Sequence, residues 1–150
     1  MTELTVHEIK GEAEILAEFD LILQINPEIT KEKFQKILPK MLHGGYRLVG
    51  VFNKDKCVGI GGFWIRHAIW CAGAFLQPDN LVVDKKYRGQ GIGKMMLDWF
   101  EDEAKRNGCK LVALESYAAN HKSHAFYMRE KFHIRGFFFC KFLNEENGGK

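Results

Sequence analysis

NLVVDKKYRGQGIGK, from Asn80 to Lys94, is the most informative segment of this sequence. It begins with an apolar run typical of a buried strand, continues through a basic turn with three glycines, and ends where an amphipathic helix begins. Glycines let the backbone of such a turn approach a ligand, and the first N–H groups of the following helix point toward any anion bound there. The stretch therefore predicts a strand, a phosphate-binding loop and a helix, in that order.

The spacing of the glycines argues against the two commonest phosphate-binding loops. In a P-loop, Arg88 would have to be glycine and Met95 would have to carry a hydroxyl group. The dinucleotide fingerprint G-x-G-x-x-G needs its third glycine where this chain has Lys94. The alternative to a phosphate site is an ordinary strand-to-helix turn, in which the glycines serve only the backbone.

The residues after the loop favour the phosphate site over the ordinary turn. Apolar side chains recur at three- and four-residue spacing in Ile92, Met95, Met96, Trp99, Phe100 and Ala104. One face of the predicted helix thus packs on a core while its start stays open to a ligand. Gly108, after Asn107, is a typical residue to end the helix.

The segment Arg88-Gly89-Gln90-Gly91-Ile92-Gly93 resembles the Q/R-x-x-G-x-G/A signature with which acetyltransferases of the GNAT superfamily hold the pyrophosphate of acetyl-coenzyme A. The resemblance implies that the coenzyme is bound by Arg88, Gly89, Gln90, Gly91, Ile92, Gly93 and Lys94. It further implies that the strand before the loop and the next strand splay apart to admit the pantetheine arm. The amides of that arm would pair with the backbone of Leu81, Val82 and Val83.

The remaining elements are predicted from periodicity and turn residues. Strands are expected at Thr5 to Ile9, Tyr46 to Phe52, Cys57 to Ile65, about Trp70 to Val83, Leu111 to Glu115 and Ile134 to Leu143. Further helices are expected at about Glu12 to Gln24, after a Thr30 cap through Leu42, and at His121 to Glu130. Pro39 would kink or interrupt the second of these, and Gln77-Pro78-Asp79 would make the strand before the loop irregular. This order is similar to the GNAT fold over nearly the whole chain, and implies a mixed, mostly antiparallel α/β sheet flanked by helices.

A second motif resembles the same family. Ser123-His124-Ala125-Phe126-Tyr127 is similar to the family's A-x-x-F-Y segment, whose tyrosine lies beside the coenzyme sulfur. The resemblance implies that Tyr127 protonates the leaving thiolate, and that Ser123 and Phe126 help to bind the coenzyme. Asn120 matches an asparagine that often contacts the pantetheine arm, and it equally suits an N-cap. After this segment Lys131 replaces the family's usual glycine, so that a tight turn has to be made by a residue less suited to positive φ.

Asp79 is the expected base for the amine, acting directly or through a water molecule. Family members often carry an acidic residue at this point of the sheet, although an aspartate after proline also suits a turn. A backbone N–H near Leu81 would stabilise the oxyanion if the irregularity at Pro78 leaves it unpaired. The acceptor would contact the region of about Asp20 to Gly45, which shows no diagnostic constellation.

Composition limits the alternatives. The 150 residues suit a single domain, 1–150, with 144–150 expected to be a disordered tail. Basic and acidic residues number 22 and 19, a net charge of +3 that argues against nucleic acid as a partner. Four widely spaced cysteines without metal-ligand spacing indicate buried free thiols, no metal site and a reducing, cytoplasmic location. No apolar run reaches the roughly 20 residues of a membrane span.

We therefore expect an acetyl-CoA-dependent N-acetyltransferase that transfers the acetyl group directly to a primary amine. The acceptor would be a small molecule or a peptide, and the protein a monomer or a homodimer. The alternative is a non-catalytic acyl-CoA-binding or regulatory module of the same fold, which would keep the loop but need neither Tyr127 nor Asp79.

Overall fold

In the computed structural model, which describes residues 3–143, the chain divides into a first unit up to Leu114 and a second unit from Glu115 onward. The expected tail at 144–150 lies outside the described residues. The first unit contains β1 (Leu4–Ile9), α1 (Glu12–Ala17), α2 (Phe19–Ile25), α3 (Lys31–His43), β2 (Arg47–Asn53), β3 (Lys56–Ala68), η1 (Ile69–Cys71), β4 (Gly73–Val83), η2 (Lys85–Tyr87) and α4 (Ile92–Arg106). The second unit contains α5 (His121–Arg129).

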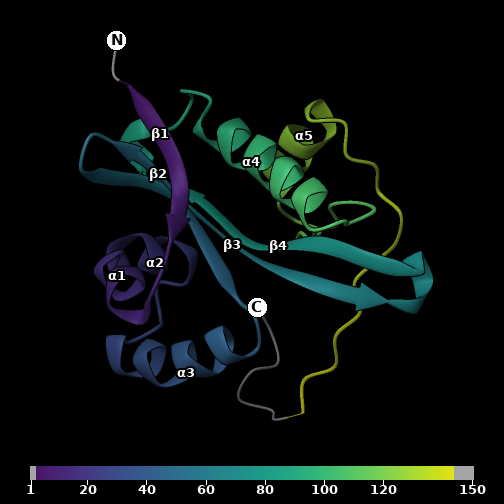
Figure 1. The fold of residues 1–150 in the computed structure, drawn as a ribbon, viewed down its shortest axis with the longest axis horizontal. Coiled ribbons are helices and arrows are strands. Elements are labelled where there is room, and N and C mark those ends of the chain that lie inside the picture. The colour runs from purple at the N-terminus through teal and green to yellow at the C-terminus, as the bar shows by residue number, and fades with distance from the viewer. Residues whose placement is uncertain (1–2, 144–150) are drawn as a thin grey trace. The chain divides into compact units, whose positions relative to one another are not determined.

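The sheet of the first unit has the strand order β1-β2-β3-β4, and every neighbouring pair is antiparallel (Figure 1). A tight turn at Lys54-Asp55 joins β2 to β3, and Lys54 adopts a φ of 54° in it. The predicted α/β fold with a mostly antiparallel sheet is confirmed.

Helices cover both faces of this sheet. On one face, Ile15, Leu21, Phe34 and Leu38 of the first three helices share a core with buried strand residues that include Val82. On the other face, Ile92 and Met96 of α4 pack with Val51 and Val58 of the strands. Of the apolar stripe predicted for α4, four residues are buried and two, Met95 and Trp99, are half-buried, so the stripe faces the sheet.

The first predicted helix is two helices in the structure, and the prediction of one continuous helix is wrong. Glu18, with φ −92° and ψ 21°, ends α1 and precedes α2. The break lets Ile15 of α1 and Leu21 of α2 enter the same core. Pro39, by contrast, lies inside α3 without interrupting it, and Thr30 caps α3 by accepting a hydrogen bond from the Lys33 N–H at 3.2 Å.

The irregularity predicted at Gln77-Pro78-Asp79 is a β-bulge. Phe63 of β3 pairs with Pro78 of β4, whereas Gly62 pairs with Asn80, so that Asp79 is an extra residue without an opposite partner. Because proline has no N–H to donate, a bulge beside Pro78 costs the fewest backbone hydrogen bonds between the two strands.

The chain after α4 runs alongside β4 without forming a full strand. Leu76 of β4 donates to the Leu111 carbonyl at 3.1 Å and accepts from the Ala113 N–H at 3.0 Å, which makes a parallel bridge between Leu76 and Val112. The strand predicted at Leu111 to Glu115 is thus present as this one bridge.

The strand predicted at Ile134 to Leu143 is absent, and that prediction is wrong. These residues adopt no regular secondary structure and are exposed to solvent. A strand needs a neighbour for its backbone groups, and local β propensity alone does not supply one. The expectation of buried thiols is right for Cys57 and wrong for Cys140, which lies in this exposed segment.

Gly62 makes room for a side chain that supports the bulge. A Cβ atom at Gly62 would lie 1.9 Å from the hydroxyl oxygen of Tyr46, which is buried. We expect Gly62→Ala to lower the free energy of unfolding by about 1–3 kcal/mol, the usual cost of overpacking. Urea denaturation of the variant and the parent protein measures the difference.

Gly73→Ala is the matched control in the same hairpin. Its nearest contact would be the Cε atom of Lys110 at 3.1 Å, at the flexible end of a side chain that can move away. We expect a change within about 0.5 kcal/mol. Equal destabilisation by both substitutions would show that the Tyr46 contact is not what requires glycine at position 62.

Candidate functional site

The glycine-rich loop connects the end of β4 to the start of α4. Asp84 accepts a hydrogen bond from the Lys86 N–H at 3.0 Å, and its carbonyl accepts one from the Tyr87 N–H at 2.8 Å, which shapes the short helix η2. Gly89 and Gly91 then adopt φ values of 77° and 78°. Side chains rarely tolerate this left-handed backbone, so the loop conformation explains why these positions are glycine.

The start of α4 is open at this loop. Gly91 is the N-cap, and within the described chain no side chain caps the helix there. The first intrahelical hydrogen bond runs from the Met95 N–H to the Gly91 carbonyl at 3.0 Å. The N–H groups of a first helical turn carry partial positive charge, so this end of α4 can attract an anion.

Basic side chains surround the loop. Arg88 is exposed, and its Nε donates to the Val83 carbonyl at 3.2 Å. Lys94 is paired with Asp98 one turn along α4, with Nζ 2.7 Å from Oδ1, and both side chains are half-exposed. An exposed pair of this kind is weak, so a phosphate group can compete for the lysine.

A charge network holds α4 on the sheet. The buried carboxylate of Glu103 forms salt bridges with Arg47 of β2 at 2.7 Å and with Arg106 at 2.6 Å. It also accepts a hydrogen bond from the side chain of Asn107 at 2.9 Å. Burial raises the pKa of Glu103, but these hydrogen bonds outweigh burial and hold it below the ordinary value. Arg47 also binds Glu8 of β1 in a bidentate pair at 2.8 Å. The network ties β1, β2 and α4 together.

The bulge places Asp79 on the surface of the sheet. Its carboxylate is exposed and accepts a hydrogen bond from the Asn80 side chain at 2.9 Å. Leu81 and Val83 are half-buried, whereas Val82 is buried in the core below the first three helices.

Tyr46 is a residue at the bulge that sequence reasoning missed. Burial raises the pKa of the Tyr46 hydroxyl to about 12. A hydrogen bond with Asn80 lowers this pKa in part, and the negative charge of Asp79 raises it by a smaller amount. The hydroxyl therefore lies beside the bulge in its neutral form. No local signal could have found it, because Tyr46 and Asn80 meet only through the pairing of distant strands.

The second unit holds the other predicted site residues. Asn120 caps α5, its side chain accepting from the Ser123 N–H at 3.4 Å, so the N-cap interpretation of this asparagine is confirmed. Phe126 and Tyr127 of α5 are half-buried with ring centroids 5.4 Å apart. Burial raises the pKa of Tyr127 above its ordinary value, so the phenol keeps its proton.

The turn after α5 has the predicted strain. Lys131 adopts a φ of 66°, and the N–H groups of Lys131 and Phe132 donate to the carbonyls of Met128 and Tyr127 at 3.1 and 3.0 Å. This is a Schellman turn made without glycine. The Phe132 ring also contacts Tyr127, with centroids 5.7 Å apart, and so restrains the tyrosine.

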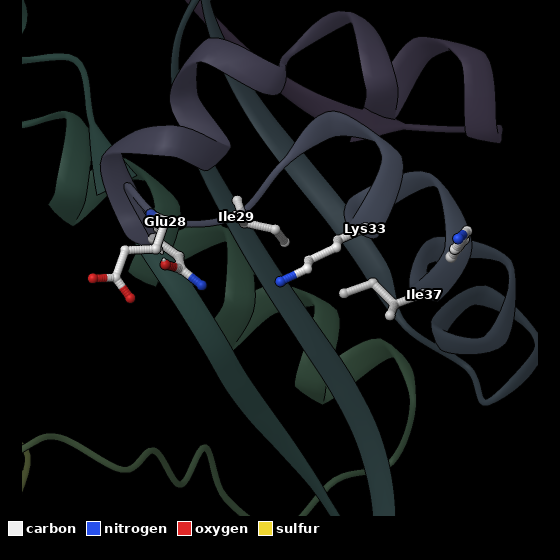
Figure 2. Close-up of a pocket in the computed structure, with 6 residues that line it drawn as sticks. Glu28, Ile29, Lys33 and Ile37 are labelled. Carbon is white, nitrogen blue, oxygen red and sulfur yellow. Dashed lines mark hydrogen bonds between the residues drawn. The ribbon is translucent and has the colours of Figure 1, made fainter. Parts of the chain in front are cut away.

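An open hollow of ≈ 460 Å³ lies between the α2–α3 connection and α3. Its lining is part apolar and part polar, with two basic residues and one acidic residue: Asn26, Glu28, Ile29, Lys33, Lys36 and Ile37. Figure 2 shows Lys33 and Ile37 projecting from α3 beside Ile29 of the connection. The hollow falls in the region where the acceptor is expected.

The described residues show neither a metal-binding cluster nor a membrane-spanning helix. Between residues 3 and 143, no three His, Cys, Asp or Glu side chains are grouped so that they could hold a metal ion. None of the helices in that range combines the length and the apolar character that crossing a membrane requires.

Comparison with solved structures shows a shared fold. Glucosamine-6-phosphate N-acetyltransferase from Arabidopsis thaliana superposes with a TM-score of 0.74 and 17% identity, over 95% of this chain and 99% of that one. AAC(6')-Iy, solved with the bisubstrate analog CoA-S-monomethyl-acetylneamine, superposes with a TM-score of 0.78 and 16% identity, over 93% and 98%.

Sequence comparison is more specific. Aminoalkylphosphonate N-acetyltransferase of Salmonella typhimurium is 36% identical over 81 residues, which are 54% of this chain and 50% of that protein. The match therefore spans half the length of this relative. The model of the acetyltransferase (GNAT) family matches residues 15–133, which include the glycine-rich loop and all of α5. This chain belongs to the acetyltransferase (GNAT) family.

Proposed function

We propose that this protein transfers the acetyl group of acetyl-CoA directly to a primary amine. The observation that carries the proposal is the glycine-rich loop at the open start of α4, in a chain that belongs to a family of acetyltransferases. The positive φ of Gly89 and Gly91 leaves the loop backbone accessible, as contact with a pyrophosphate requires.

The coenzyme would be held by the loop and by the edge of β4. Arg88, Gln90, Gly93 and Lys94 would meet the phosphates, and Leu81 to Val83 would pair with the pantetheine amides. Pairing with the pantetheine amides requires β4 and the following strand to splay apart. Pro78 supports this splay, because it has no N–H with which to continue the hydrogen bonds that Leu76 makes with Leu111 and Ala113. From the second unit, Asn120, Ser123 and Phe126 would complete the coenzyme site.

Three groups would perform the chemistry. An aliphatic amine has a pKa of about 10.4, so Asp79, directly or through water, would take its proton before the nitrogen attacks the thioester carbonyl. A backbone N–H near Leu81 would stabilise the oxyanion. Tyr127 would give its proton to the sulfur as the C–S bond breaks. The thiol is a stronger acid than the phenol, so this transfer is modestly uphill, and its contribution is to neutralise the charge that develops on the sulfur.

The loop assignment predicts that Gly91→Glu strongly weakens coenzyme binding. A side chain at this φ strains the turn, and a carboxylate there repels the phosphates. We expect affinity for CoA to fall at least about tenfold, as measured by calorimetry.

Gly108→Glu is the control, because Gly108 has a similar φ of 65° and ends the same helix at its far end. It adds the same backbone strain and charge away from the loop, and we expect unchanged affinity for CoA. Equal affinities for the parent protein and Gly91→Glu would refute the loop as the coenzyme site.

The acid assignment predicts that Tyr127→Phe lowers kcat about 100-fold and leaves affinity for CoA unchanged. Because burial raises the pKa of this phenol, the parent's activity should persist to a pH above the ordinary tyrosine value of about 10 and fall beyond it. A thiol-release assay over a panel of amines and a pH series measures both effects.

Tyr117→Phe is the control, since Tyr117 is exposed and lies in the same unit. Normal turnover by Tyr127→Phe would contradict the assignment of Tyr127 as the sole acid. Coenzyme binding without turnover by the parent on any amine would favour the non-catalytic acyl-CoA-binding module instead.

We further propose that the acceptor is a small amine bearing a phosphonate or phosphate group. The relative from Salmonella typhimurium is an aminoalkylphosphonate N-acetyltransferase. The hollow beside α3 offers the cations Lys33 and Lys36 next to apolar Ile29 and Ile37, and its lining also includes the carboxylate of Glu28. The lysines suit the anionic end of a short alkyl chain, and the carboxylate suits an ammonium group.

This acceptor proposal predicts a selective loss in Lys33→Gln/Lys36→Gln. We expect KM for an aminoalkylphosphonate to rise about tenfold, while KM for a neutral alkylamine and affinity for CoA stay the same. Lys40→Gln, an exposed lysine of α3 outside the hollow, is the control. Equal KM changes for the charged and the neutral amine would contradict recognition of the anion by these lysines.

We also propose that the protein is a single domain located in the cytoplasm. A single acetyltransferase domain in the cytoplasm agrees with the free cysteines of the described residues. The net charge of +3 gives no reason to expect nucleic acid as a partner.

A further inference from the structure

The side chains of Asp79 and Asn80 meet although the two residues are neighbours in β4. The Nδ2 atom of Asn80 donates to the Oδ2 atom of Asp79 at 2.9 Å. In a regular strand successive side chains point to opposite faces of the sheet, which would keep these two groups apart. The extra residue of the bulge interrupts that alternation and brings both side chains to one side.

A tyrosine from a distant part of the chain reaches the same amide. Tyr46 immediately precedes β2, and its hydroxyl forms a hydrogen bond with Asn80 of β4. Because β3 lies between these two strands, the tyrosine has to reach across it. It does so at Gly62, which pairs with Asn80 and where a Cβ atom would clash with the tyrosine hydroxyl. Glycine at this position thus lets side chains from β4 and from the start of β2 meet.

Tyr46 is held firmly in this position. Its side chain is buried in the core below the first three helices, and its ring lies against Trp64 with centroids 5.3 Å apart. Its N–H donates to the Met41 carbonyl at 2.9 Å. Burial raises the pKa of the hydroxyl to about 12, so the group stays neutral over the pH range in which most enzymes work. The Asn80 amide is therefore oriented by a buried group with little freedom to move.

We propose that Tyr46 and Asn80 are positioning residues that orient the Asp79 carboxylate toward the amine. This inference rests on the proposed function, in which Asp79 is the base. The amide occupies Oδ2, so Oδ1 is left to accept a proton from the ammonium group or from a bridging water. A catalytic group acts efficiently only when it is held within about 0.5 Å of its productive position, and the buried tyrosine supplies that support through the amide.

Tyr46→Phe removes the hydroxyl and keeps the ring that packs on Trp64. We expect kcat to fall about tenfold, because the carboxylate is no longer held in place, while KM for the amine and affinity for CoA stay the same. Asn80→Leu, which removes the amide itself, should have the same effect. A thiol-release assay and calorimetry measure these quantities.

A double-mutant cycle separates positioning from a general loss of structure. Asp79→Asn alone should lower kcat about 100-fold. Adding Tyr46→Phe to it should cause no further loss, because the group that the tyrosine orients is already gone. A further tenfold loss in the double variant overturns the proposal. Parent-like kcat in Tyr46→Phe with a loss in Asp79→Asn refutes the positioning role alone, whereas parent-like kcat in Asp79→Asn refutes the base as well.

Gly62→Ala disturbs the same contact while all three polar side chains remain. The new Cβ atom should displace the Tyr46 hydroxyl and lower kcat about tenfold. Gly73→Ala, in the same hairpin but away from Tyr46, is the matched control and should keep the parent's kcat. Equal kcat values for the two variants overturn the proposal.

Crystal structures of the parent and of Tyr46→Phe test the orientation without any turnover. We expect the Asp79 carboxylate of the parent in one conformation, bound by Asn80 as in the computed structure. In the variant we expect this hydrogen bond to be lost or the carboxylate to occupy several conformations. An identical, singly ordered carboxylate in both structures overturns the proposal, whichever amine the protein acetylates.

Discussion

The extra residue at Asp79 determines which face of the sheet each half of β4 presents to the helices of the first unit. Ahead of it, Pro78 pairs with Phe63, whose ring packs on Phe100 of α4. Beyond it, Val82 pairs with Ile60, and both belong to the core on the opposite face of the sheet. Pro78 and Val82 thus face opposite sides, although they are an even number of residues apart. In a regular strand, residues of equal parity face the same side. The bulge shifts this alternation, so that each half of β4 presents its apolar side chains to the correct helices.

A second set of contacts decides where the open end of α4 lies. Phe100 packs in space that Gly61 leaves free, since a Cβ atom there would lie 2.7 Å from its ring. One turn further, Glu103 is buried against Arg47. Removing one partner of such a pair costs more than the pair contributes, because the other charge is left buried and unpaired. The middle and end of α4 are therefore held firmly, and its start at Gly91 needs no side-chain cap for stability. A helix fixed in this way can leave its first N–H groups to a ligand.

The features predicted correctly from the sequence were those with a local physical cause. Glycines at positive φ marked the loop, Pro78 marked the irregular part of β4, and Thr30 marked the start of α3. The features that were missed depend on residues distant in sequence. The break at Glu18 follows from packing of two short helices on one core, and the hydroxyl of Tyr46 meets Asn80 only because Gly62 lies opposite Asn80 across the sheet. Helical periodicity is nearly the same for one long helix and two short ones, so the pattern could not separate them.

The segment 134–143 shows the limit of such prediction most clearly. Its alternating and aromatic pattern predicts a strand, yet the chain forms none there. A helix satisfies its backbone groups within itself, and α5 accordingly forms at the place its sequence predicts. A strand satisfies its backbone N–H and C=O groups only by pairing with a neighbouring strand, and the sequence pattern of one strand does not identify that neighbour. Such a pattern therefore predicts that a partner exists and says nothing of which molecule carries it.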